Sequence, residues 1–152
     1  MTIKSTMLNF ITTLFIILFA YAAVSKILDW EMFNFQLGRS PFIHMHAKFV
    51  GFLVPSTELL ISSFLCVSRL RVLGLYMSLY LMTLFSGYIF LLLRFSPYIP
   101  CSCGGILSSM TWNQHLVFNM IFVILALFGI PLAESRRNSL SQTKSSITSL
   151  LQ

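Results

Sequence analysis

Two cysteines with one residue between them are the strongest chemical signal in this chain. Cys101 and Cys103 lie in the run PCSCGG at 100–105, and the whole sequence of 152 residues holds only 3 cysteines. A disulfide across one residue closes a tight, strained ring, and strain makes a disulfide a better electron acceptor. The flanking proline and glycines favour the turns that such a ring needs. The pattern predicts a redox pair that exchanges with thiols of a partner protein.

Two other interpretations of this pair stay open. His44 and His46 form a His-x-His, and His115 stands at the start of the last apolar stretch. Imidazole and thiolate together suit zinc or copper, so these three histidines and the two cysteines could form a metal site. The last interpretation is a structural staple within the loop. We prefer redox exchange, and we consider a metal the less favoured cofactor.

Lys26 and Glu58 are ionisable residues within otherwise apolar stretches. Charges at membrane depth are costly, and they mark functional sites or specific pairing. Lys26 could extend along its own stem to the membrane surface, whereas Glu58 cannot reach as far. The simpler interpretation is an ion pair between two helices. The functional alternative is a contact for a proton or a quinone, which makes a quinone the candidate cofactor.

The elements that must position these residues follow from composition. Hydrophobic residues make up 57% of the chain and charged residues 9%, against roughly 25% charged in a soluble domain. Four apolar stretches, at about 7–28, 47–67, 72–93 and 114–133, each have the roughly 20 residues that a membrane-spanning helix needs. They do not alternate as barrel strands would. The sequence predicts an all-α integral membrane protein, a four-transmembrane-helix bundle over residues 1–133.

Two features at the ends of the chain qualify this division. The residues at 20–22, Ala-Tyr-Ala, fit a signal-peptide cleavage site, but the apolar run continues to Leu28. That run exceeds the usual apolar region of a signal peptide, so we expect an uncleaved span. Residues 134–152 are rich in serine and threonine, and we expect a flexible polar cytoplasmic tail.

The distribution of positive charge predicts an orientation. Six Lys and Arg residues fall on the side of the two termini and four on the other side. Arg69 and Arg71 lie in a very short loop, where the positive-inside rule is most reliable. Both termini are therefore predicted to be cytoplasmic, and the loops at 29–46 and 94–113 extracytoplasmic. This places Cys101 and Cys103 in an oxidising compartment, where disulfides form.

Three motifs resemble a known family. The run SKILD at 25–29 resembles the end of the first span in the DoxX-like superfamily of four-helix membrane proteins. The run LVPSTELL at 53–60 and the run CSCGG at 101–105 resemble its methylamine-utilisation branch, the MauE family. The resemblance covers about residues 8–132. It implies a multi-pass protein of the bacterial inner membrane with the cysteine pair on the periplasmic side.

The resemblance also implies a role. MauE is implicated in maturation of methylamine dehydrogenase, whose small subunit has many disulfides, and DoxX-like proteins are linked to quinone or thiol oxidation. We expect extracytoplasmic thiol–disulfide exchange, or maturation of a periplasmic redox protein, with Cys101 or Cys103 attacking and the other resolving. The expected partners are the lipid bilayer and a thiol or disulfide protein, and no basic patch with interleaved aromatics indicates nucleic acid.

Two alternative functions remain. One is binding or transport of a soft metal through the cysteines and histidines of the outward loops. The other is a non-catalytic subunit of a membrane redox complex. The sequence leaves open whether the chain is itself a thiol–disulfide oxidoreductase component.

Overall fold

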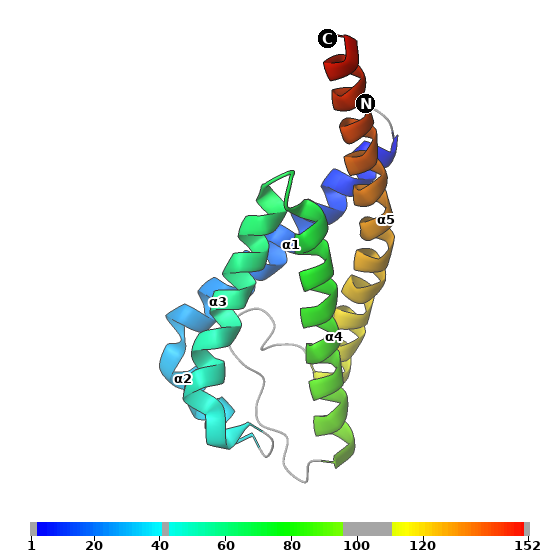
Figure 1. The fold of residues 1–152 in the computed structure, drawn as a ribbon. Coiled ribbons are helices and arrows are strands. Elements are labelled where there is room, and N and C mark those ends of the chain that lie inside the picture. Colours follow the sequence, from blue (N-terminus) through cyan, green and yellow to red (C-terminus); the bar gives the residue numbers. More distant parts are fainter. Residues whose placement is uncertain (1–2, 41–42, 96–110, 151–152) are drawn as a thin grey trace.

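Four long apolar helices form the body of the protein (Figure 1). The computed structural model describes residues 3–40, 43–95 and 111–150, and within these ranges it contains helices and no strand. The helices long and apolar enough to cross a membrane are α1 (Ile3–Leu28), α3 (Ala47–Cys66), α4 (Arg71–Phe95) and α5 (Trp112–Leu150). The predicted all-α, four-span membrane fold is confirmed.

A further helix lies where the sequence predicted only a loop. Helix α2 (Trp30–Gly38) and the 3₁₀ turn η1 (His44–His46) occupy most of the segment between α1 and α3. Asp29 departs from helical geometry, with φ −102° and ψ 40°, and so separates α1 from α2. Phe33 and Leu37 are buried, and residues four apart share one helix face. Nine residues are too few for this periodicity to stand out in the sequence.

The last helix also extends further than the sequence suggested. We expected a flexible tail at 134–152, but α5 continues as a helix to Leu150. No glycine or proline follows Pro131, so nothing removes a donor from the backbone hydrogen-bond series or loosens it. The Ser139 hydroxyl donates back to the Ser135 carbonyl at 3.0 Å, a bond that polar side chains make within helices.

The spanning helices are arranged as two pairs. Helix α1 packs on α3, and α4 packs on α5. Figure 1 shows both chain ends and the α3–α4 turn at one end of the molecule, here called the terminal end. Helix α2 lies toward the opposite end, here called the α2 end, where the two pairs stand apart.

An aromatic cluster joins the two pairs. Phe15 of α1 is fully buried, and its ring meets Phe122 of α5 edge to face, with centroids 5.2 Å apart. Phe19 stacks beside Phe15 at 5.9 Å. Between membrane helices, such close packing replaces the hydrophobic driving force that water would supply. The pairs are therefore held together in the half of the bundle between this cluster and the terminal end.

Gly51 lets α2 lie directly against α3. A Cβ atom at position 51 would overlap the Asn34 side-chain oxygen of α2. The amide of Asn34 donates to the Trp30 carbonyl at 3.0 Å, which holds that side chain in place. The position of α2 thus depends on the missing side chain.

We predict that Gly51→Leu displaces α2 and lowers stability by about 1–3 kcal/mol, the usual cost of overpacking. Thermal unfolding of the full chain in detergent would measure the change. Asn34→Ala should restore part of the loss in the double variant, because it removes the atom that a side chain at position 51 would meet. Equal stability of the wild type and Gly51→Leu would show that α2 does not depend on this contact.

Candidate functional site

A buried ion pair links α1 and α3. Glu58 stands eleven residues beyond the start of α3, about 16 Å along the helix, and its side chain is 1% exposed. The Lys26 ammonium donates to Glu58 Oε1 at 2.8 Å and to Oε2 at 3.1 Å. It also donates to the Ala22 carbonyl at 3.2 Å. The structure therefore contains the interhelical pair that the sequence suggested.

The direction of the Lys26 side chain has a geometric cause. Side chains of an α-helix tilt toward its N-terminus, and Lys26 lies in the last turn of α1. Its stem therefore runs back into the bundle, toward Glu58, and not outward to the membrane surface. The ring of Phe33 in α2 lies over the ammonium, 5.9 Å from its centroid, a favourable cation–π contact.

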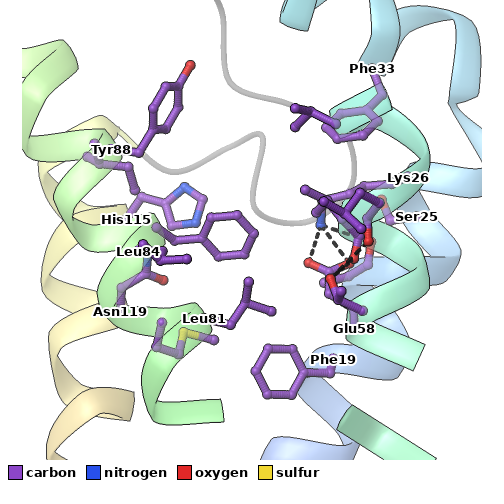
Figure 2. Close-up of a pocket in the computed structure, with 18 of the residues that line it drawn as sticks. Phe19, Ser25, Lys26, Phe33, Glu58, Leu81, Leu84, Tyr88, His115 and Asn119 are labelled. Carbon is purple, nitrogen blue, oxygen red and sulfur yellow. Dashed lines mark hydrogen bonds and ion pairs between the residues drawn. The ribbon is translucent and has the colours of Figure 1, made fainter. Parts of the chain in front are cut away.

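A cavity of about 620 Å³ lies beside this ion pair, between the two helix pairs. Figure 2 shows Lys26 and Glu58 on one wall and His115 and Asn119 on the facing wall, with Phe19 below. The lining is predominantly apolar. Ligand sites typically combine such a lining with a few convergent polar groups, so this cavity is the candidate binding site.

The facing wall carries a hydrogen-bond donor that no described residue uses. Asn119 is 3% exposed, and its Nδ2 has no acceptor among the described residues. Leaving a buried donor unpaired costs about 1–3 kcal/mol. His115 lies on the same helix face, four residues earlier. The cavity is therefore suited to a largely apolar molecule that carries a hydrogen-bond acceptor.

The cavity is also bordered by a contact between α4 and the end of α2. The hydroxyls of Tyr88 and Ser40 lie 2.8 Å apart, and Ser40 is 1% exposed. Tyr88 lines the cavity. This bond connects the helix pairs at the α2 end, where they otherwise diverge.

The other predicted site residues are placed as follows. Cys101 and Cys103 lie outside the described residues. His44 and His46 are exposed in η1, whereas His115 is half-buried in the cavity wall. Within the described ranges, no three His, Cys, Asp or Glu side chains come close enough to hold a metal ion.

A lone cysteine in an apolar stretch is usually buried, but Cys66 is not. Cys66 ends α3 and is exposed, while the preceding Leu65 is fully buried. Successive helical positions differ by about 100° around the axis, so the residue after an inward one turns away from the core.

Sequence reasoning missed Asn119 as a site residue. An amide within an apolar span is uncommon and often bonds across helices or lines a cavity. The same rule that singled out Glu58 would have found Asn119. No sequence signal indicates that the two face one cavity.

Comparison with known proteins gives one match. The family model of the methylamine utilisation protein MauE matches residues 4–132, and this confirms the predicted resemblance to the MauE family. No curated protein and no solved structure matches the chain.

We predict that Lys26→Met destabilises the protein by about 3 kcal/mol. This is the low end for breaking a buried pair, because the stranded carboxyl can take up a proton. Lys26→Met with Glu58→Met should cost less than the single change, because no buried charge then lacks a partner. Thermal unfolding of both variants in detergent tests this. A double variant less stable than Lys26→Met alone would contradict the argument.

Proposed function

The chain belongs to the MauE family, and on that premise we propose that it exchanges disulfides with an extracytoplasmic protein through Cys101 and Cys103. The partner in this proposal is an extracytoplasmic protein that needs disulfides for its maturation, such as a periplasmic redox protein. The chain is a multi-pass membrane protein, and we propose the bacterial inner membrane with both termini cytoplasmic.

The observation that supports this proposal is that the helices on either side of the cysteine segment end beside the cavity. Helix α4 ends at Phe95, and α5 begins at Trp112, which lines the cavity. Cys101 follows Phe95 by six residues, a length of chain that spans at most about 20 Å. The two helix ends from which the cysteine segment continues therefore lie at the α2 end of the bundle, where the cavity is.

The exchange step balances as follows. A thiolate of the partner attacks one sulfur of the Cys101–Cys103 disulfide, and the other cysteine leaves as a thiolate. The second thiolate of the partner then attacks the mixed disulfide. The partner gains a disulfide, and two electrons and two protons pass to the cysteine pair.

Another turnover needs an acceptor for those electrons, and we propose a quinone. The residues present fit such a molecule, because the cavity offers apolar walls with the Lys26 ammonium and the unpaired Asn119 amide on opposite sides. A bound quinone would accept two electrons and two protons from the dithiol and restore the disulfide. The Asn119 amide would donate to one of its carbonyl oxygens, while the Lys26 ammonium, whose N–H groups are taken by Glu58 and the Ala22 carbonyl, would contribute its charge to that wall.

We predict that Cys101→Ser or Cys103→Ser accumulates a mixed disulfide with a partner in intact cells. The remaining cysteine can attack or be attacked, but it has no neighbour to resolve the product. Thiol trapping and electrophoresis without reductant would reveal the adduct. Cys66→Ser is the matched control and should leave the wild-type pattern.

Two results would contradict the exchange role. One is a cysteine pair that stays fully reduced in cells, with no adduct in either variant. The other is full function of the Cys101→Ser, Cys103→Ser double variant, which would favour the non-catalytic subunit.

The quinone step has a separate test. We predict that Asn119→Leu slows reoxidation of the reduced cysteine pair by a short-chain benzoquinone about tenfold, the value of one good hydrogen bond. Thiol alkylation over time in isolated membranes measures the rate. Asn113→Leu makes the same change at an exposed position of the same helix and should leave the rate unchanged. An unchanged reoxidation rate in Asn119→Leu would show that the cavity is not the quinone site. It would leave the proposed thiol–disulfide exchange unaffected.

A further inference from the structure

Two arginines converge on one neutral oxygen near the terminal end. Arg71, the first residue of α4, donates from Nη1 to Asn9 Oδ1 at 3.1 Å. Arg136 of α5 donates from Nη1 to the same oxygen at 3.2 Å. Three helices thus meet at this point, and the two guanidinium nitrogens lie within about 6 Å of each other, where like charges repel.

No carboxylate in the described ranges compensates these charges. The ion pair that the described residues contain, Lys26–Glu58, lies in the other half of the bundle, away from the two arginines. Glu134, the acidic residue nearest to Arg136 in sequence, accepts the Tyr76 hydroxyl at 3.0 Å. The Nε of Arg71 is buried and has no acceptor among the described residues. The cluster therefore combines unneutralised positive charge with an unused, directed donor.

The chemistry of the missing acceptor follows from the donors. Guanidinium groups bind phosphate in a bidentate manner, through parallel N–H bonds that a single point charge does not provide. Arg71 begins a spanning helix, so its side chain lies near the level where lipid phosphates are found. Phe10 and Leu73, which stand close to Asn9 and Arg71 in the sequence, have exposed apolar side chains at the same end of the bundle. These are suited to lie along an acyl chain.

We propose that Arg71 and Arg136, oriented by Asn9, bind the phosphate of an anionic phospholipid at the terminal end of the bundle. A zwitterionic lipid is less suited, because its own cation would add to the two charges already present. The predicted orientation places the site in the cytoplasmic leaflet, where basic pockets between helices bind anionic headgroups. The site is separate from the cavity and does not depend on the thiol exchange.

The test uses the full chain, purified in detergent and stripped of lipid. Binding of phosphatidylglycerol is measured by the rise in melting temperature during titration, beside phosphatidylcholine and inorganic phosphate. Phosphatidylglycerol should stabilise the wild type, and the other two should not at equal concentration. Arg71→Gln with Arg136→Gln should weaken phosphatidylglycerol binding about twentyfold or more, since each basic residue contributes roughly a fivefold effect.

The control is Arg69→Gln with Arg137→Gln, which removes the same charge from exposed residues at the same end. It should weaken binding clearly less. Equal losses of phosphatidylglycerol affinity in the two double variants would show a diffuse electrostatic attraction instead of a specific site. An equal rise in melting temperature with inorganic phosphate would show that the site binds free phosphate and not a lipid.

A conservative pair guards against misfolding. Arg71→Lys with Arg136→Lys keeps both charges but loses the planar donor arrangement, and should still bind several-fold more weakly. Unchanged affinity in this variant would overturn the bidentate site.

Discussion

A carboxyl group in the middle of a membrane helix restricts everything around it. Glu58 is almost completely buried, and an unpaired charge at this position would raise the free energy of the folded protein by roughly several kcal/mol. Among the residues that the structure describes, its partner is Lys26, and this pair fixes how α1 lies against α3. Helix α2 follows directly and places Phe33 over the same ammonium. The pair therefore stabilises three helices as one unit, and one wall of the cavity is a consequence of it.

The second unit consists of α4 and α5. It contacts the first unit through aromatic packing, and the two units diverge toward the α2 end. Phe15 and Phe122 close the bundle, and above them the walls separate into a cavity. Helix α5 then presents Asn119 and His115 to the ion pair across an apolar space. A site between rigid helix pairs keeps its polar groups fixed, and this suits the recognition of a mostly apolar acceptor.

The two ends of the molecule differ in how they treat charge. At the α2 end, Lys26 is neutralised inside the protein. Near the terminal end, Arg71 and Arg136 share an amide oxygen of Asn9, and no carboxylate among the described residues pairs with either of them. We propose that the first arrangement serves a site within the bundle and that the second binds the surrounding lipid. A total charge of +6 conveys none of this difference.

Much of this protein can be derived from its sequence alone. Bilayer thickness sets the length of a spanning helix, so hydropathy identified the four long apolar helices, although α5 continues well beyond the predicted span. The rarity of charge within the apolar stretches singled out Lys26 and Glu58. Helix α2, which the sequence did not reveal, depends on its packing neighbour. It can lie against α3 because Gly51 has no side chain that would overlap Asn34. That Asn119 faces the ion pair, and that Arg71 meets Arg136 at Asn9, was decided only by the tertiary structure. Such contacts depend on how each helix is rotated and crossed against the others, and hydropathy along a chain carries no information about rotation between distant helices.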